Sequence, residues 1–362
     1  MILNDTITND VDFIICTNNE LWFSECERYI RKLCIPVGIH IHVIPVWNAR
    51  NMCNGYNIGM RQSKAKYKVY LHHDTFIINP DFIADILRIF KSDEKIGLLG
   101  LVGADEIKRQ KIAWGDWEYG KTLGCNGLSE KCINFGSIEG LYQQTDCVDG
   151  MLIATQYDIP WREDIFTKWD LYDRSICIEF RRQGYMVVVP KQEKPWCIHD
   201  CGPSGLLNWK QEMILFVNTY TEYFSAETIG NSVTEEIYEH MLEQTVAYTK
   251  DAEVAFHEGD YNAVAGIINT VIKQRLMISK RMMEMYNLLT IAMSCQTNLF
   301  FQSNDTLETM TIKLTKARFL LRRLYYGLEL DEAECSFLQQ LSTDEKAFVI
   351  KTGLTFSASQ TR

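Results

Sequence analysis

Prolines and glycines are scarce, and their distribution divides the chain. Only seven prolines occur in 362 residues, all of them between Pro36 and Pro203, and 15 of the 21 glycines also precede residue 204. This scarcity excludes a linker-rich or low-complexity protein. Since proline is disfavoured inside helices, the proline-free second half is expected to be helical. We predict two domains, residues 1–215 and 216–362.

Long cationic runs and long apolar runs are also absent. No run of Lys and Arg exceeds two residues, and 37 basic against 47 acidic residues leave a formal net charge of −10. A nucleic-acid partner held by a basic face is therefore not expected. No stretch approaches the roughly 18 apolar residues of a membrane span. Peripheral association with a membrane stays compatible with this sequence.

Cysteines are numerous, but they do not follow disulfide spacing. The 12 cysteines form no pairs at framework intervals, and most lie in apolar runs, where reduced Cys acts as a small hydrophobic residue. The first 12 residues carry no cation, so we expect no secretory signal. Together these features predict a cytoplasmic protein.

The first half alternates short apolar runs with helical stretches. Strands are predicted over residues 12–17, 39–46, 66–71, 96–102, 148–154 and 186–189, and helices over 54–63, 80–91 and 170–183. This alternation predicts an α/β fold with a largely parallel sheet, in which ligands bind beyond the carboxyl ends of the strands. Residues 114–140, rich in glycine and aromatic side chains, fit neither pattern and are expected to form a lid or binding loop, or else a surface excursion.

The second half is predicted to be all-helical. Helices are expected over residues 233–255, 261–295 and 306–326, with a shorter pair after Asp331. The junction from Ala255 to Tyr261 resembles the turn of a tetratricopeptide-like hairpin, although no clean 34-residue repeat is present.

Candidate metal ligands follow two of the predicted strands. One strand runs directly into His72, His73 and Asp74, and His199 follows another strand at the same predicted edge. Asp74 and His72 share one side of the strand, so the pair can hold a divalent ion against a diphosphate. The alternative is a strand-end Asp that caps the next helix. A structural zinc site is not expected, because Cys197 and Cys201 have no second Cys/His pair.

Acidic and aromatic residues gather before the helix that ends at Gly184. Four acids, Glu163, Asp164, Asp170 and Asp173, fall within eleven residues and are interleaved with Trp169 and Tyr172. Acids in a first helical turn are favoured by the helix dipole, which explains one of them. The whole group is more typical of a site that handles hydroxyls, because aromatics pack on sugar rings while carboxylates accept their protons.

These motifs resemble the family 2-like glycosyltransferases of the GT-A fold, and specifically the bacterial branch whose metal motif reads His-x-Asp. Within GYNIGMRQSKAKYKVYLHHDTFI, Asn57 precedes Asp74 by the family's seventeen residues, and Tyr172-Asp173 stands eleven residues before Gly184. The segments VDGMLIATQYD, GYMVVVP and WCIHD add to the likeness, which covers about residues 10–205.

The resemblance implies a GT-A mixed, mainly parallel sheet with flanking helices, a nucleotide-diphosphate sugar donor, and inversion at the anomeric carbon. It implies a divalent cation, Mn²⁺ or Mg²⁺, held by His72, Asp74 and His199, and it makes Asp173 the catalytic base. It assigns donor binding to Thr17, Asn18, Asn19, Asn57, His73 and Asp74. It assigns the acceptor side to Asp149, Gly150, Trp169, Asp170 and Tyr172.

The chain departs from the family at two places. Val46-Trp47-Asn48 stands where the family usually has an acid after the second strand, and Tyr172 replaces the customary Glu beside Asp173. Two rival readings stay open. One is a metal-dependent hydrolase that uses His72, His73, Asp74, His199 and Asp200. The other is a catalytically degenerate sugar- or nucleotide-binding module whose helical half binds another protein.

Overall fold

The computed structural model describes residues 8–105, 117–126, 129–201, 209–224, 235–274 and 306–340, together with 276, 279, 281–282 and 284–285. The chain divides into two compact units. The first comprises residues 1–123, 133–200 and 208–233, and the second comprises 124–132, 201–207 and 234–362.

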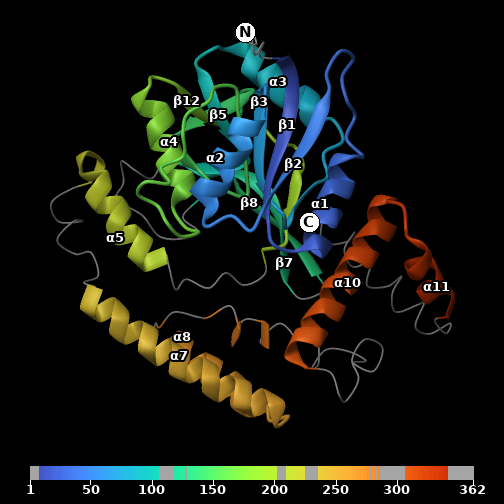
Figure 1. Ribbon diagram of the computed structural model, residues 1–362, viewed down its shortest axis with the longest axis vertical. Helices are drawn as coiled ribbons and strands as arrows, with labels where there is room; N and C mark the ends of the chain where they lie inside the picture. Colours follow the sequence, from blue (N-terminus) through green and yellow to red (C-terminus); the bar gives the residue numbers. More distant parts are fainter. Residues whose placement is uncertain are drawn as a thin grey trace, which may run out of the picture. The chain divides into compact units, whose positions relative to one another are not determined.

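A mixed, mainly parallel sheet forms the centre of the first unit (Figure 1). Its strands stand in the order β2-β1-β3-β11-β5-β12-β9, and only β11 and β9 run against the others. Their bounds are β1 (Thr8–Thr17), β2 (Ile41–Trp47), β3 (Ala65–His72), β5 (Ile96–Gly100), β9 (Tyr142–Thr145), β11 (Leu152–Thr155) and β12 (Met186–Pro190). The predicted α/β fold with a largely parallel sheet is confirmed.

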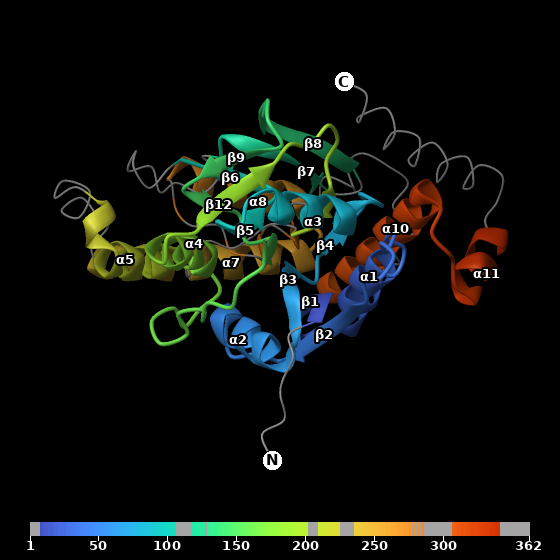
Figure 2. The ribbon, with the colours of Figure 1, turned by 90° about the horizontal axis from the view of Figure 1, so that it is seen from above.

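Helices cover both faces of this sheet (Figure 2). They are α1 (Glu20–Ile30), α2 (Met52–Gln62), α3 (Phe82–Ser92), α4 (Tyr172–Arg182) and α5 (Trp209–Thr219). Successive side chains of a strand point to opposite faces of the sheet, and the side chains of β1 alternate in this way. Phe13 meets Phe82 of α3 with ring centroids 6.4 Å apart, whereas Ile14 lies in the core that α2 and α4 share.

Helix α5 also packs into that core. Phe216 of α5 and the following Tyr220 are fully buried there, and Ser175 of α4 bonds the Tyr220 hydroxyl at 2.7 Å. The predicted domain boundary after residue 215 falls inside α5, while the first compact unit continues to residue 233. The division into two functional domains stays a prediction.

A second sheet holds the edge at which the candidate site lies. Its order is β10-β6-β7-β13-β4, with β8 paired to β7. The bounds are β4 (Thr75–Ile77), β6 (Val102–Ala104), β7 (Tyr119–Asn126), β8 (Ser129–Gly136), β10 (Cys147–Val148) and β13 (Cys197–His199).

Four expectations about elements were wrong. The strand predicted over 96–102 ends at Gly100 as β5, and Val102 begins β6, which belongs to the other sheet. The single strand predicted over 148–154 is split into β10 and β11, with Asp149 and Gly150 at the break. The stretch 114–140, which was predicted to be irregular, contains strands β7 and β8, and its residues 114–116 and 127–128 lie outside the described ranges. The helix predicted from Tyr261 to residue 295 ends at Lys273.

The described part of the second unit after residue 234 is helical, whereas its residues 124–126 and 129–132 belong to strands β7 and β8. It contains α7 (Glu235–His257), α8 (Tyr261–Lys273), α10 (Leu307–Tyr326) and α11 (Glu332–Gln340). Helices α7 and α8 pack through residues that include Phe256 and Ile268. Gly259 turns the chain between them in the left-handed region, at φ +76°, and Asp260 accepts a hydrogen bond from the Ala263 amide at 3.0 Å. The expected helical C-terminal region is confirmed.

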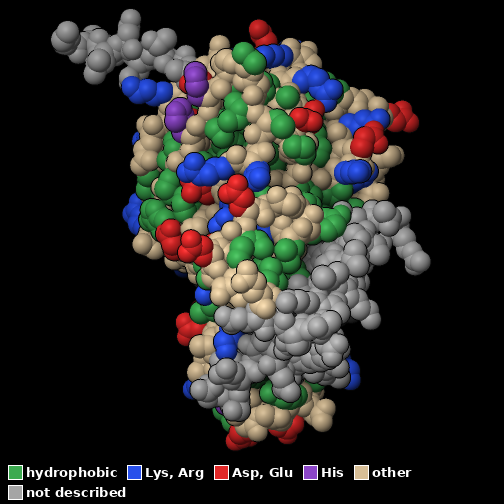
Figure 3. Space-filling model, turned by 90° about the vertical axis from the view of Figure 1, so that its right-hand side faces the viewer, with side chains coloured by type: hydrophobic (Ala, Val, Ile, Leu, Met, Phe, Trp, Pro, Cys, Tyr) green, Lys and Arg blue, Asp and Glu red, His purple; other side chains and the backbone are tan. Residues whose placement is uncertain are grey.

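One face of the molecule shows how the charged side chains are distributed (Figure 3). On the face in Figure 3, Lys and Arg side chains are interspersed with Asp and Glu and do not gather into a basic patch. Among the described helices, none combines the length and the apolar character that a membrane crossing requires.

Candidate active site

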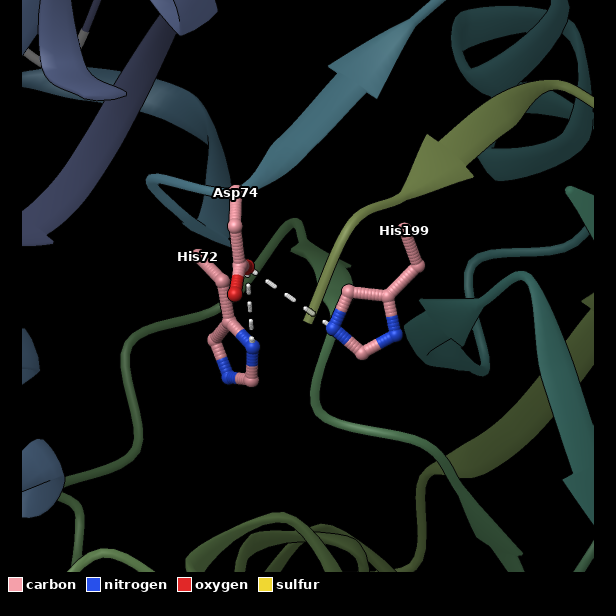
Figure 4. Close-up of side chains that lie close together, drawn as sticks. All are labelled: His72, Asp74 and His199. Carbon is pink, nitrogen blue, oxygen red and sulfur yellow. Dashed lines mark ion pairs between the residues drawn. The ribbon is translucent and has the colours of Figure 1, made fainter. Parts of the chain in front are cut away.

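Two histidines and an aspartate meet where β3, β4 and β13 come together (Figure 4). His72 ends β3, Asp74 lies in the turn before β4, and the antiparallel pairing of β13 with β4 places His199 opposite Thr75. Asp74 Oδ1 lies 3.7 Å from both His72 Nδ1 and His199 Nε2. One ligand atom from each of the three residues lies within 4.8 Å of the others.

This group fits a divalent cation. The separations of 3.7 Å are too long for hydrogen bonds, and ligands that share one ion at about 2.1 Å each lie at similar spacing. Asp74 Oδ1 is buried and has no hydrogen-bond partner among the described residues. Two imidazoles and one carboxylate form a mixed set that suits Mn²⁺ and related transition ions.

Electrostatics puts Asp74 and His72 in the protonation states that a metal requires. Burial alone would raise the pKa of Asp74, but the adjacent imidazoles of His199, His72 and His73 outweigh it, so the pKa is lowered. Burial lowers the pKa of His72 to about 4, and the carboxylate of Asp74 opposes this only in part. At neutral pH Asp74 is therefore ionised and His72 is neutral.

A second group forms at the start of α4, beside the break between β10 and β11. Leu171, which precedes the helix, adopts a left-handed conformation at φ 55° and ψ 4°. A branched residue in this region stores local strain, which is typical of functional sites. The Asp173 carboxylate that follows accepts hydrogen bonds from the backbone amides of Gly150 at 2.9 Å and Arg174 at 2.8 Å.

The carboxyl group of Asp173 titrates near neutrality. Burial raises its pKa to about 7, with a further contribution from Asp149, while Arg174 and the amide of Gly150 act in the opposite direction. A carboxylate with a pKa near the working pH can accept and release a proton efficiently. Asp173 therefore has the electrostatic character of a general base.

Tyr172 joins the two groups. Its hydroxyl contacts Nε2 of His72, and a Cβ atom at Gly150 would overlap that hydroxyl. The absence of a side chain at Gly150 thus makes room for Tyr172, while the amide of the same glycine holds Asp173. Burial, with Tyr56 and Asp173, raises the pKa of Tyr172 well above its ordinary range, so the hydroxyl is neutral.

A sequence profile described as "Glycosyltransferase like family" matches residues 12–220, which is more than half of the chain and includes both groups. The chain belongs to this family. With the mixed, mainly parallel sheet, this confirms the GT-A fold class expected from the sequence.

Three solved structures illustrate what this glycosyltransferase is similar to. A mannosyltransferase from Pyrobaculum calidifontis, in complex with GDP-Man and Mn²⁺, is 13% identical over 98% of this chain and 88% of its own, with a TM-score of 0.39. The first 349 residues of TarS from S. aureus, in complex with UDP, are 10% identical over 97% and 89%, with a TM-score of 0.37. A Drosophila β-1,4-galactosyltransferase 7 mutant, with manganese, UDP-Gal and xylobiose, is 12% identical over 53% and 71%, with a TM-score of 0.35. No curated protein matches the chain.

The predicted donor residues of the glycosyltransferase fall into two sets. At the end of β1, the Thr17 hydroxyl lies 2.9 Å from Nδ1 of His73, whose ring stacks on Trp22 at 5.9 Å. Asn19 caps α1 by accepting hydrogen bonds from the amides of residues 21 and 22, and Asn18 is exposed beside it. These four donor residues lie at the end of β1 or in the turn after β3, the turn that also contains Asp74.

Asn57 forms the second set, because its side chain makes hydrogen bonds to the segment before α4. Its buried carboxamide donates to the Trp161 carbonyl at 2.9 Å and to Glu163 at 3.0 Å, and it accepts a hydrogen bond from the Trp161 amide at 2.9 Å. These bonds tie α2 to the segment before α4. The contacts give Asn57 a structural role, and its part in donor binding stays a prediction.

Trp169 and Asp170 complete the predicted acceptor side. Trp169 is 47% exposed, which leaves its ring available to a ligand. Burial raises the pKa of Asp170 to about 6, and burial together with Asp170 raises the pKa of Glu212 to about 7. Within the described part of the chain, Asp170 forms no hydrogen bond to Asp173 or Tyr172. The contact between His72 and Tyr172 was not anticipated, since no local pattern links residues 100 positions apart.

Proposed function

We propose that this glycosyltransferase is metal-dependent and inverting, and that it moves a hexose or N-acetylhexosamine from a nucleotide-diphosphate sugar to a hydroxyl of a glycan or protein acceptor. The observation that carries the proposal is the pairing of two groups at one edge of the sheet. The cluster around Asp74 suits a cation, and the buried carboxylate of Asp173 suits a base. Tyr172 contacts the first group and is adjacent in sequence to the second.

His72, Asp74 and His199 would hold the cation, whose positive charge would neutralise the charge that develops on the departing diphosphate. Asp74 supplies the negative charge of the set, and the two imidazoles supply neutral nitrogen donors. Thr17, Asn18, Asn19 and His73 would hold the rest of the donor.

Asp173 accepts the proton of the acceptor hydroxyl in this proposal. The Gly150 amide fixes the position of its carboxylate, and the start of α4 favours the ionised form. A single displacement needs one base and no carboxylate that acts as a nucleophile. It inverts the configuration at the anomeric carbon. Trp169, Asp149 and Asp170 would line the acceptor side.

Thermal stabilisation by a panel of nucleotide sugars tests this function. We expect a small number of them to raise the melting temperature in the presence of Mn²⁺ and to lose this effect with EDTA. A ligand at 100 times its Kd stabilises a protein by about 2.7 kcal/mol. Mn²⁺ should serve at least as well as Mg²⁺, because imidazole ligands suit Mn²⁺ better. Stabilisation that is insensitive to EDTA would contradict the metal assignment.

We further propose that the helical part of the chain selects the acceptor. The His72–Asp74–His199 cluster, which lies in the first compact unit, is the only such cluster found among the described residues. A chain ended after Val233 retains the last segment of the first unit. We expect it to keep metal-dependent stabilisation by the donor and to lose most transfer to the native acceptor, measured by product formation. Transfer at the full rate would refute this division.

A further inference from the structure

Tyr172 makes a contact that the catalytic scheme above does not use. Its hydroxyl meets Nε2 of His72, which is the ring nitrogen that does not face Asp74. The other nitrogen, Nδ1, lies 3.7 Å from Asp74 Oδ1 and is directed to the side on which His199 also stands. The contact therefore acts on the orientation of the imidazole from behind the cluster.

Packing holds the Tyr172 hydroxyl in place. The side chain is 4% exposed, and its ring lies 5.9 Å from the ring of Tyr56 and 6.0 Å from that of Trp161. The hydroxyl occupies the space that a Cβ at Gly150 would fill. A hydroxyl fixed in this way imposes its hydrogen-bonding geometry on His72.

The direction of this hydrogen bond decides what His72 can do. A neutral imidazole carries one proton, and only its unprotonated nitrogen can bind a cation. If Nε2 holds the proton and donates it to the tyrosine oxygen, Nδ1 is free to bind a cation between Asp74 and His199. With the proton on Nδ1, that nitrogen could not be a ligand. Outer partners of ligating histidines act in this way, by fixing the tautomer and the ring orientation.

We infer that Tyr172 is a positioning residue of the cation site, where its hydroxyl accepts a hydrogen bond from Nε2–H of His72 and keeps Nδ1 directed at Asp74 and His199. This inference rests on the proposed function, because it requires that the cluster bind a divalent cation. It gives the residue that replaces the family's customary Glu a role in metal binding.

Calorimetric titration of the full chain with MnCl₂ tests the inference. We expect Tyr172→Phe to weaken Mn²⁺ binding about tenfold, the lower end of the 10–100-fold cost of losing an outer-shell partner. Tyr56→Phe is the matched control, because Tyr56 is also fully buried, packs on the same ring and has a hydroxyl without a hydrogen-bond partner in the described residues. Its Mn²⁺ affinity should equal that of the wild type.

The tautomer provides a readout that a purely structural role would not move. In metal-free protein labelled with ¹⁵N-histidine, the signals of residue 72 are identified by their loss in His72→Gln. They should report a proton on Nε2 in the wild type and a mixture of tautomers in Tyr172→Phe. Unchanged tautomer and unchanged Mn²⁺ affinity in this variant would overturn the positioning role and leave the metal assignment intact. A wild-type chain that binds no Mn²⁺ would instead overturn the proposed function, and this inference with it.

Gly150→Ala tests the same role without removing the hydroxyl, in case Tyr172→Phe fails to fold. The added methyl group would displace the tyrosine oxygen from His72, so Mn²⁺ affinity should again fall about tenfold. Gly140→Ala is the control, since a Cβ there meets only the Tyr142 carbonyl oxygen at 3.6 Å. Wild-type Mn²⁺ affinity and tautomer in a folded Gly150→Ala variant would also count against the inference.

Discussion

Replacement of Asp74 by Ala should abolish metal-dependent binding of a nucleoside diphosphate. Asp74 is the anionic member of the cluster and lies 3.7 Å from each of the two imidazoles. Its removal leaves two neutral nitrogen donors, which cannot offset the charge of a divalent cation. We expect Mn²⁺ affinity to fall by at least about 100-fold, beyond the usual cost of losing an outer-shell partner. Affinity for UDP or GDP should lose its dependence on Mn²⁺ and become weak.

Calorimetry with Mn²⁺ alone, and then with each diphosphate in the presence and absence of Mn²⁺, measures these effects. Asp81→Ala is the control, because Asp81 follows in the same part of the chain but is exposed and forms no side-chain cap at the start of α3. Circular dichroism should be the same for both variants. If Asp74→Ala binds the diphosphate with unchanged affinity that still depends on Mn²⁺, the ligand set has been assigned to the wrong residues.

The cluster around Asp74 could be anticipated because it depends on simple properties of strands. A parallel sheet gathers the residues that follow its strands at one edge, so His72, Asp74 and His199 were expected to lie near one another. They do lie together, but the structure brings His199 to the other two by a different route, through the antiparallel pairing of β13 with β4 in the second sheet. Their roles as ligands stay predictions until metal binding is measured.

The rest of the site depends on backbone detail that hydrophobic patterns do not carry. Leu171 adopts a left-handed conformation that favours glycine, and its apolar side chain gives no sign of this. The apolar run over 148–154 predicted one continuous strand, whereas the chain breaks at Gly150 so that Tyr172 and Asp173 can approach. Asn57 matched a family interval, yet its carboxamide is satisfied by Trp161 and Glu163. Such contacts depend on tertiary packing, so spacing alone could not predict them.

Replacement of Asp173 by Asn should separate catalysis from donor binding. Asn has the shape of Asp and can still accept a hydrogen bond from the Gly150 amide, but it lacks a basic oxygen. We expect the transfer rate to fall by about 10²–10⁴, the usual contribution of a positioned base. Affinity for Mn²⁺ and for the donor should change little, because Asp173 is not among the three grouped ligands.

The pH dependence gives this prediction a second readout. Since the pKa of Asp173 is raised to about 7, the wild-type rate should rise with pH through neutrality as the carboxylate ionises. The residual rate of Asp173→Asn should lack this step. The free energy of unfolding should respond to pH in the opposite direction, falling where the rate rises. Folding raises the pKa from about 4 to about 7, so the folded state binds the extra proton between these values. Wild-type stability therefore falls relative to Asp173→Asn as the pH rises from about 4 to 7.

Asp170→Asn is the control that distinguishes geometry from titration. The pKa of Asp170 is raised by burial to about 6, so Asp170 and Asp173 both have the electrostatic character of a base. Of the two carboxylates, only that of Asp173 accepts a hydrogen bond from the Gly150 amide. Only Asp173 directly follows the residue that contacts His72. We therefore expect Asp170→Asn to reduce the transfer rate much less. If Asp170 proves indispensable and Asp173 does not, the base has been assigned to the wrong carboxylate, and the acceptor must approach from the side of Asp170 and Glu212.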